Sequence, residues 1–446
     1  MRQWWPQVGG PNGACLVPVT SSSPQRVAMI SMHTSPLEQP GAGDAGGMNV
    51  YVAEVTKRMA QRGVAVDVFT RATSLDQPAA VELAPGVTVR HVPAGPSGQL
   101  DKNSLTHYLC PFIFGVLGAG SGTSADSNSE IPGYDLVHAH YWLSGRAGMT
   151  VARRWGVPLV QSMHTLARVK DLALPAAGAT AEPEIRLRGE SQLVRTADRI
   201  VANTPVEAEE LARHYGADRS RLTVVPPGAD LEMFTPGPRA SALAELGLAP
   251  DTELLLFAGR IQRLKGPEVL VRAAAQLVRR RPELRSRLLV ALVGGSSGEP
   301  AEPDRLSRLA AQLGIADLVR LDGPRSGADL ATYYRAASVT VVPSHAESFG
   351  LVAVESQACA TPVVAARVGG LPLAVRDGVS GMLVDGHDPG DYATALERLL
   401  GNPTWRASLA DGARQHAAGL GWSATVDGLL DIYQTLAAAP AQSAPA

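Results

Sequence analysis

The sequence has few cysteines, and this limits the kinds of site that it can build. Its three cysteines, Cys15, Cys110 and Cys359, lie far apart and form no C-x-x-C pair. This spacing argues against a zinc site and against a disulfide framework, and it fits a reducing compartment. We therefore expect a cytoplasmic protein.

Long apolar runs and an excess of charge of one sign are also missing. No stretch approaches the ~20 consecutive apolar residues of a membrane-spanning helix, and the first residues lack the apolar centre of a signal peptide. The formal net charge is only −2, so no global basic field favours nucleic acid or a membrane surface. We expect small-molecule partners, with no nucleic acid and no membrane.

The chain has the size and composition of a two-domain globular protein. Its 446 residues are more than a single hydrophobic core usually accommodates, so two domains are expected. Of these residues 45% are hydrophobic and 18% are charged, which is typical of a globular protein. Strand-like and helix-like segments alternate in both halves, which is typical of α/β folds. We predict a flexible leader at 1–24, domains at 25–235 and 236–419, a last helix (420–437) packing back onto the first domain, and a tail at 438–446.

Two further segments are irregular by composition. Val224–Pro238 is rich in proline and glycine and has no periodicity, so it is predicted to be the linker between the domains. Gly118–Glu130 is of low complexity and is predicted to be an exposed loop.

The most informative stretch is Pro343–Pro362, PSHAESFGLVAVESQACATP. A β-branched run precedes it and a helical pattern fills its second half, so a strand, a tight loop and a helix are predicted. The free N–H groups at such a helix start favour an anion. Glu347 lies in the loop and Glu355 follows about two helical turns later, so both carboxylates can border one cleft. Equally, Glu347 could cap the helix and Glu355 could lie on a solvated face.

Two other strand-to-helix connections carry phosphate-binding features. After the strand at Arg26–Ser31, a glycine-rich turn with Gly46 and Gly47 leads into a helix from Met48. This is the arrangement that cradles phosphates in doubly wound sheets, although the spacing is not G-x-G-x-x-G, and the glycines could merely turn the chain. In the second half, Arg260 and Lys265 stand just before a helix, where cations and amides would hold a pyrophosphate. Ordinary exposed basic residues are the alternative.

The order of motifs resembles a known family. HAESFGL…E…TPVVAARVGG is similar to the nucleotide-sugar signature of the retaining GT-B glycosyltransferases. HTSPLEQPGAGDAGGMNVYV, HAHYWLSG, MHTLA and GRIQRLKGP together resemble the actinobacterial D-inositol-3-phosphate glycosyltransferases of glycosyltransferase family 4. The resemblance runs from about Arg26 to Leu436. It implies an α/β GT-B fold, in which two Rossmann-like doubly wound domains face each other across a cleft, the first binding the acceptor and the second the UDP-sugar.

The resemblance also implies a reaction. N-acetylglucosamine would move from UDP-N-acetylglucosamine to 1D-myo-inositol 3-phosphate with retention, giving GlcNAc-inositol phosphate and UDP, the first step of mycothiol biosynthesis. It further implies a homodimer and no organic cofactor. A structural Mg²⁺ would be held by oxygens of Tyr334, Arg335, Ala337 and Thr361.

Each functional residue of the family can be placed on this sequence. The resemblance implies four catalytic residues: Glu347, Arg260, Lys265 and His164, although His164 could equally be a structural residue at a strand end. Donor contacts would be Gln39, Pro40, Gly47, Arg260, Lys265, Arg325, Glu347 and Glu355. Acceptor contacts would be His33, Asp44, Ala45, Gly46, Gly47, Met48, Asn49, Lys102, Tyr141, Thr165 and Arg186. Lys102, Tyr141, Thr165 and Arg186 make chemical sense as a phosphate clamp of two cations and two hydroxyls, with Arg188 as an alternative to Arg186.

Other functions remain possible at this point. A transferase of the same fold could use another sugar-phosphate acceptor, as sucrose-phosphate enzymes do, but the HTSPLEQPG and DAGGMNVY segments count against it. An epimerase would need no phosphate clamp, and a phosphorylase would need a cofactor lysine that cannot be identified. A non-catalytic nucleotide-sugar sensor is disfavoured because the residues of the donor site are intact.

Overall fold

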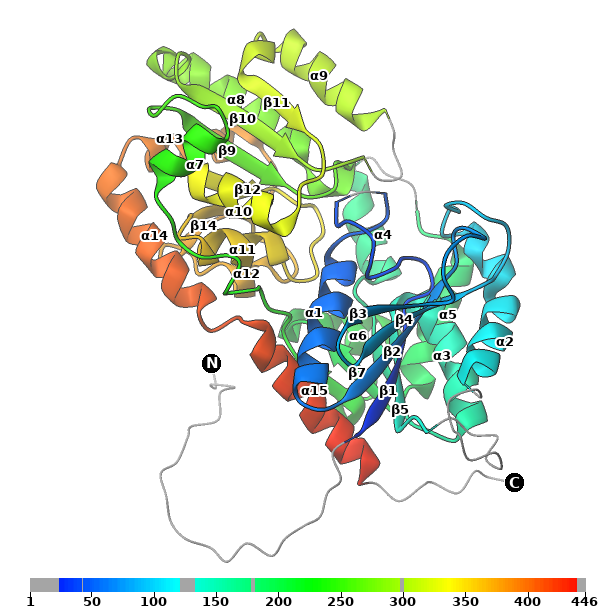
Figure 1. Ribbon diagram of the computed structural model, residues 1–446. Coiled ribbons are helices and arrows are strands. Elements are labelled where there is room, and N and C mark those ends of the chain that lie inside the picture. The colour runs from blue at the N-terminus through cyan, green and yellow to red at the C-terminus, as the bar shows by residue number, and fades with distance from the viewer. Residues whose placement is uncertain (1–23, 42, 121–132, 178–180, 297–300, 439–446) are drawn as a thin grey trace, which may run out of the picture.

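The computed structural model describes residues 24–41, 43–120, 133–177, 181–296 and 301–438. Within them the chain forms two α/β units, each built on its own sheet (Figure 1). Nearly all of the predicted leader, most of the predicted low-complexity loop and most of the predicted tail lie outside the described residues.

The first unit contains an eight-stranded sheet in the order β3-β4-β2-β1-β5-β6-β7-β8, parallel except for the edge strand β3. Its central strands are buried almost throughout, which explains their continuous apolar runs. The strands are β1 (Arg26–Ile30), β2 (Ala65–Arg71), β3 (Ala80–Ala84), β4 (Val87–Val92), β5 (Leu136–His140), β6 (Leu159–Ser162), β7 (Arg199–Ala202) and β8 (Leu222–Val224).

Helices cover both faces of this sheet and form two separate cores. One core packs α2 and α3 against the sheet, and the other packs α1 and the last helix of the chain. The helices of this unit are α1 (Gly47–Gln61), α2 (Leu109–Gly120), α3 (Tyr141–Trp155), α4 (Ala167–Ala177), α5 (Glu184–Thr196) and α6 (Pro205–Tyr215), with short 3-10 helices η1 (Ser104–Tyr108) and η2 (Arg219–Arg221).

The second unit contains a six-stranded parallel sheet in the order β11-β10-β9-β12-β13-β14. Its strands are β9 (Glu253–Ala258), β10 (Leu288–Val293), β11 (Val319–Asp322), β12 (Val339–Val342), β13 (Val363–Ala366) and β14 (Gly381–Val384). Its helices are α7 (Arg239–Glu245), α8 (Pro267–Arg280), α9 (Glu302–Gln312), α10 (Gly327–Ala336), α11 (Leu351–Ala358), α12 (Leu371–Ala374), α13 (Pro389–Leu400) and α14 (Pro403–Ala417), with 3-10 helices η3 (Arg263–Lys265), η4 (Pro282–Leu284) and η5 (Ala316–Leu318).

The chain crosses between the units twice, and the two crossings lie side by side. The Ala229 amide donates to the Leu420 carbonyl at 2.8 Å, and the Thr425 hydroxyl donates to the Pro226 carbonyl at 2.8 Å. A Cβ on Gly228 would lie 2.4 Å from backbone atoms of the returning segment, so this approach requires glycine. The last helix, α15 (Trp422–Ala437), then packs on α1 of the first unit (Figure 1).

The sequence predicted the doubly wound architecture correctly but missed several elements. The strands and α-helices that were not predicted are β3, β14, α4, α7, α9 and α12. Strand β3 has no buried residue, and β14 is short and begins with glycine, so neither has the apolar run of a buried strand. The predicted loop at Gly118–Glu130 starts too early, because α2 continues through Gly120.

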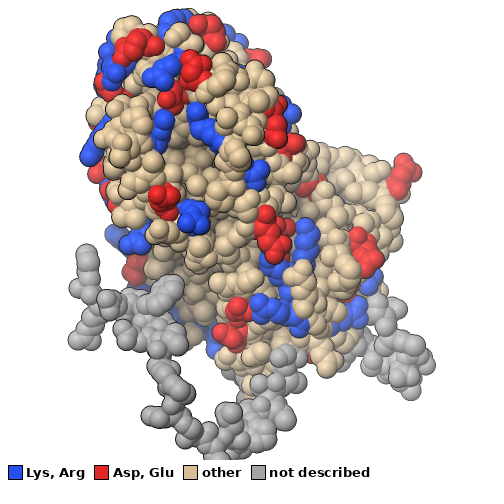
Figure 2. Space-filling model, turned by 60° about the vertical axis from the view of Figure 1, so that its left-hand side comes forward, with Lys and Arg blue, Asp and Glu red and all other residues tan. Residues whose placement is uncertain are grey.

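The surface agrees with the near-neutral sequence. Figure 2 shows acidic and basic side chains interspersed over the visible face, with no broad field of one sign. Among the described residues, no helix combines the length and apolar character that crossing a membrane requires.

Candidate active site

Loops at the carboxyl ends of strands in the two units meet one another. The Gly295 amide after β10 donates to the Gly41 carbonyl after β1 at 2.8 Å. The Ser348 hydroxyl after β12 donates to the carbonyl of His164 after β6. The carboxyl ends of the two parallel sheets therefore face each other, which is where α/β folds place their ligands.

The two predicted diphosphate cations lie after β9, at the entry to α8. Lys265 Nζ donates to Glu347 Oε2 at 2.6 Å. Burial lowers the pKa of Arg260, although the Asp44 and Glu347 carboxylates oppose the shift. The connection is tight, because a Cβ on Gly266 would lie 2.2 Å from the Pro343 carbonyl oxygen.

The loop that carries Glu347 is held by the glycine pair that follows β13. The Gly370 amide donates to the Glu347 carbonyl at 2.9 Å, and a Cβ on Gly369 would lie 2.0 Å from that same oxygen. The Glu347 carboxylate also accepts from the Ser344 hydroxyl at 3.3 Å. The VGG segment thus fixes the backbone of Glu347, so that its side chain reaches Lys265.

Glu355 is buried on α11, so its alternative place on a solvated face is wrong. It is 8% exposed, and its Oε2 accepts a hydrogen bond from the Tyr334 hydroxyl at 2.8 Å. Burial raises the pKa of this carboxyl to about 7, and the hydrogen bond from Tyr334 opposes the rise.

Three of the four predicted acceptor-phosphate residues come together in the first unit. Arg186 Nη2 donates to Thr165 Oγ1 at 2.9 Å, and the guanidinium carbon lies 4.9 Å from the centre of the Tyr141 ring. Arg186 is only 2% exposed. The neighbouring Arg188 points outward and pairs with Glu184 on the surface, so Arg186 is the arginine that reaches Thr165.

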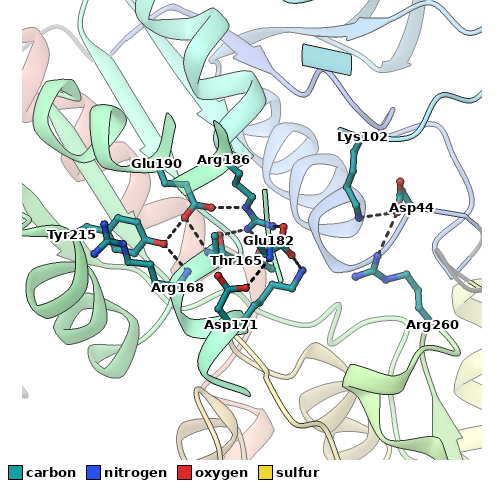
Figure 3. A network of polar contacts seen from close by, with 12 residues as sticks. Asp44, Lys102, Thr165, Arg168, Asp171, Glu182, Arg186, Glu190, Tyr215 and Arg260 are labelled. Atoms are coloured by element: carbon teal, nitrogen blue, oxygen red, sulfur yellow. Dashed lines mark hydrogen bonds and ion pairs between the residues drawn. The ribbon is translucent and has the colours of Figure 1, made fainter. Parts of the chain in front are cut away.

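Two carboxylates already bind the Arg186 guanidinium (Figure 3). Its Nε donates to Glu190 Oε1 at 2.7 Å, and its Nη1 pairs with Glu182 Oε2 at 2.8 Å. Sequence reasoning missed both partners. For Glu190 the signal was present, because it lies four residues after Arg186 on α5 and this spacing places side chains together on one helix face. Glu182 precedes α5, so no helical spacing points to it.

The fourth predicted phosphate residue, Lys102, binds a different carboxylate. Its Nζ lies 3.1 Å from Asp44 Oδ1, and Arg260 Nη1 of the second unit lies 4.0 Å from the same oxygen (Figure 3). Burial would raise the pKa of Asp44, but Lys102, with smaller contributions from His33 and Arg260, lowers it overall. Asp44 is thus an ionised carboxylate between a predicted acceptor cation and a predicted donor cation.

The glycine-rich loop after β1 is organised by Asn49. Its amide nitrogen donates to Thr34 Oγ1 and to the Ser35 carbonyl, both at 2.6 Å, and its Oδ1 accepts from the Gly46 amide at 3.0 Å. A Cβ on Gly46 would lie 3.3 Å from Arg260 Nε, and one on Gly47 would lie 3.3 Å from Leu351. These glycines therefore let the first unit approach the second closely.

The predicted site histidines are both neutral. Burial, with Lys102, lowers the pKa of His33 to about 3, and burial lowers the pKa of His164 to about 3. His33 packs on Tyr141 with ring centres 4.5 Å apart, and His164 Nε2 lies 2.9 Å from His140 Nδ1. Neither histidine can serve as a cation near neutral pH.

Backbone strain marks the two strand ends that bear these groups. His164 has φ 60° and Tyr141 has φ 73°. Non-glycine residues in this region cost about 1–2 kcal/mol each and concentrate at functional sites. At His164 the strained backbone presents the carbonyl that accepts the hydrogen bond from Ser348 in the other unit.

The remaining predicted residues are placed less tightly. Gln39 and Pro40 are exposed on the loop after β1, while Ala45 is buried and Met48 half-buried in the same region. Arg325 lines a cavity of about 400 Å³ in the second unit, together with Arg320, Asp322 and Tyr333.

The predicted magnesium ligands lie at the junction of α10 and β13. Thr361 Oγ1 donates to the Tyr334 carbonyl at 2.6 Å, so two of the four predicted groups are brought together. The set is made of neutral oxygens, the ligand type that Mg²⁺ accepts. Elsewhere among the described residues, no group of three or more His, Cys, Asp or Glu could hold a metal ion.

Comparisons with known proteins agree with this arrangement. A family model described as "Glycosyl transferase 4-like domain" matches residues 46–228, and one described as "Glycosyl transferases group 1" matches residues 239–416. Curated relatives named D-inositol 3-phosphate glycosyltransferase are 64% identical in Nocardiopsis dassonvillei, over 93% of this chain and 95% of the relative, and 63% identical in Thermobifida fusca, over 92% and 93%.

Solved structures show the same fold. The sucrose-phosphate synthase of Thermosynechococcus elongatus is 33% identical with a TM-score of 0.82, over 92% of this chain and 99% of that one. Anabaena HepE, solved with UDP and glucose, is 21% identical with a TM-score of 0.72, over 92% and 100%, and supports the fold alone. The two facing parallel sheets are those of the GT-B glycosyltransferases, and the chain belongs to the D-inositol 3-phosphate glycosyltransferase family.

Proposed function

We propose that the protein transfers N-acetylglucosamine from UDP-N-acetylglucosamine to 1D-myo-inositol 3-phosphate with retention of configuration, as the first step of mycothiol biosynthesis. The observation that carries the proposal is the meeting of two cation groups at the facing sheet ends. Arg260 of the second unit and Lys102 of the first lie on the same oxygen of Asp44. Lys265 lies on the same connection as Arg260, and Arg186 contacts Thr165 on the first unit. The names of the relatives supply the inositol 3-phosphate acceptor.

On the donor side, the chemistry required is stabilisation of the departing UDP. Negative charge develops on the β-phosphate oxygen as the sugar bond breaks, and Arg260, Lys265 and the start of α8 would stabilise it. Preorganised donors of this kind typically contribute several kcal/mol of transition-state stabilisation. The donor phosphates would compete with the Glu347 carboxylate for Lys265 and leave Glu347 for the sugar hydroxyls.

Retention is best explained by attack from the face that UDP leaves, with the phosphate taking the acceptor proton. A covalent route would need a carboxylate nucleophile at the sugar. Asp44 is a carboxylate that lies against a cation of each unit, but its pairing with Lys102 and Arg260 disfavours a role as nucleophile. A glycosyl group trapped on Asp44 and located by mass spectrometry would disprove this mechanism.

The test of the proposed reaction is UDP release from UDP-N-acetylglucosamine with and without 1D-myo-inositol 3-phosphate. We expect strong acceptor-dependent release and a product with the mass of GlcNAc-inositol phosphate. Donor turnover without a response to this acceptor would leave the donor site intact and discard the acceptor. Other sugar phosphates, including the acceptor of sucrose-phosphate enzymes, would then be compared on the same protein.

Three further properties belong to the proposal. Oxygens of Tyr334, Arg335, Ala337 and Thr361 would hold a Mg²⁺ ion with a structural role, supported by the Thr361–Tyr334 contact. The protein would be a cytoplasmic homodimer. Sedimentation equilibrium tests the dimer, and a melting temperature that rises with Mg²⁺ in the wild type but not in Thr361→Val tests the ion.

A further inference from the structure

Glu190 and Glu182 both bind Arg186, but they differ in their other partners. Glu190 is fully buried. Its Oε2 accepts from the Ala167 amide at 2.9 Å and from the Tyr215 hydroxyl at 2.5 Å. With the Arg186 guanidinium, three groups from α4, α5 and α6 therefore hold this carboxylate, and it is a fixed structural partner of Arg186.

Glu182 is the opposite case. Its side chain is 14% exposed, and the partners of its carboxylate are the Lys170 ammonium and the Arg186 guanidinium. Burial would raise the pKa of Glu182, but Arg186 and Lys170 lower it. This carboxylate is therefore an ionised group held by two cations and reachable from solvent.

Lys170 is a third cation in the same neighbourhood, on α4. Its side chain is 23% exposed, and its Nζ binds Glu182. Burial lowers the pKa of Lys170, and repulsion from Arg186 and Lys102 adds to the shift, while Glu182 opposes it. The Glu182 carboxylate, which is partly exposed, therefore lies between two cations, Lys170 and Arg186.

We propose that Lys170 is a further phosphate-binding cation of the acceptor site, and that Glu182 occupies the place of the phosphate between Lys170 and Arg186 until the acceptor displaces it. This inference rests on the proposed function. A phosphate monoester carries about −1.5 to −2 charges and three acceptor oxygens. It can therefore satisfy Lys170, Arg186 and the Thr165 hydroxyl together, which one carboxylate cannot.

The proposal predicts opposite effects for the loss of Lys170 and the loss of the Glu182 charge. If the Lys170–Glu182 ion pair were merely structural, both changes would have the same effect. Loss of Lys170 removes a phosphate ligand, whereas loss of the Glu182 charge removes a competitor. Lys170→Gln should raise the KM for 1D-myo-inositol 3-phosphate about tenfold or more, the value of a charge-assisted hydrogen bond. Glu182→Gln should lower the same KM about threefold or more. Neither should change the KM for UDP-N-acetylglucosamine.

Matched controls are available in the same unit. Lys57→Gln removes a lysine that pairs with Glu54 on the surface of α1. Glu184→Gln changes a glutamate two positions from Glu182 that is 64% exposed and pairs with Arg188. Both controls should leave the KM for either substrate unchanged.

The experiment combines steady-state kinetics with calorimetric titration by inorganic phosphate. Phosphate should bind more weakly to the Lys170→Gln protein and more tightly to the Glu182→Gln protein than to the wild type. This titration needs no turnover, so it tests Lys170 and Glu182 even where the wild type fails to use the acceptor and the proposed function falls. Lys170→Arg, which keeps the charge, should retain most of the affinity and covers the case in which Lys170→Gln does not fold.

Two results would overturn the inference. The first is a Lys170→Gln protein with unchanged acceptor KM and unchanged phosphate affinity. The second is a Glu182→Gln protein whose acceptor KM rises, because Glu182 would then position Arg186 for the acceptor instead of competing with it. An equal rise in both substrate KM values in the Lys170→Gln protein would likewise mark a structural role.

Discussion

Glu355 offers a sharp test of the donor site through pH. Burial raises the pKa of its carboxyl to about 7 in the ligand-free protein, against the hydrogen bond from Tyr334. Ribose hydroxyls that donate to this carboxylate favour its ionised form. We therefore expect UDP-N-acetylglucosamine to bind more tightly as pH rises through 7, with release of a proton on binding at lower pH.

The size of the effect follows from the pKa. For a group with a pKa of about 7, the ionised fraction rises from roughly one thirtieth at pH 5.5 to roughly nine tenths at pH 8. The dissociation constant should fall about 30-fold across this range, or about 2 kcal/mol. The nearby His33 and His164, each with a pKa of about 3, stay neutral throughout and add nothing to the slope.

Isothermal titration calorimetry in two buffers of different ionisation enthalpy measures both the affinity and the proton release. The intact UDP-sugar is the proper ligand, because the terminal phosphate of free UDP titrates in the same range. Glu355→Gln should bind with an affinity that does not change between pH 5.5 and 8. A flat profile in the wild type, or the wild-type slope in Glu355→Gln, would refute the assignment of Glu355 to the ribose.

Three other changes have expected outcomes. Lys265→Ala should lower kcat about a hundredfold through loss of leaving-group stabilisation, with Arg263→Ala, on the same 3-10 helix, near wild type in the same assay. Gly228→Ala should reduce the free energy of unfolding by about 1–3 kcal/mol, because its Cβ would lie 2.4 Å from backbone atoms, whereas Gly133→Ala meets nothing within 4 Å and should be neutral by thermal unfolding. Burial raises the pKa of Glu207 to about 7, so the folded state binds more protons than the unfolded state between about pH 4.5 and 7 and stability falls as pH rises through that window. Glu207→Gln should reduce this fall, measured by urea unfolding at pH 5 and pH 8.

The sequence predicted all strands except β3 and β14, because buried parallel strands have continuous apolar runs and glycines mark the turns after them. It also placed Arg260, Lys265 and Glu347 at one sheet edge, and the structure brings Lys265 and Glu347 into contact. Contacts that depend on how the two units sit together could not be read from the sequence. The hydrogen bond from Ser348 to the His164 carbonyl joins residues 184 positions apart and depends on a strained backbone that no local pattern predicts.

The carboxylate partners of the cations were also missed, although each lies in the same unit as its cation, and those partners change how the site works. Lys265 binds Glu347, Lys102 binds Asp44, and Arg186 binds Glu182 and Glu190. Each predicted phosphate-binding cation named here is therefore neutralised in the ligand-free protein, which agrees with the interspersed charges of Figure 2.

Ligand binding is then an exchange of anions and not the filling of a bare positive pocket. Each cation contributes to the free energy of ligand binding only the difference between its interaction with a phosphate and its interaction with a carboxylate. Much of the Coulomb energy therefore cancels. Selectivity consequently depends on geometry: a phosphate can accept from several cations and hydroxyls at once, while a carboxylate offers two oxygens. A carboxylate ligand of similar size should therefore compete poorly with the acceptor phosphate, because it offers the cations no more than Glu182 already does.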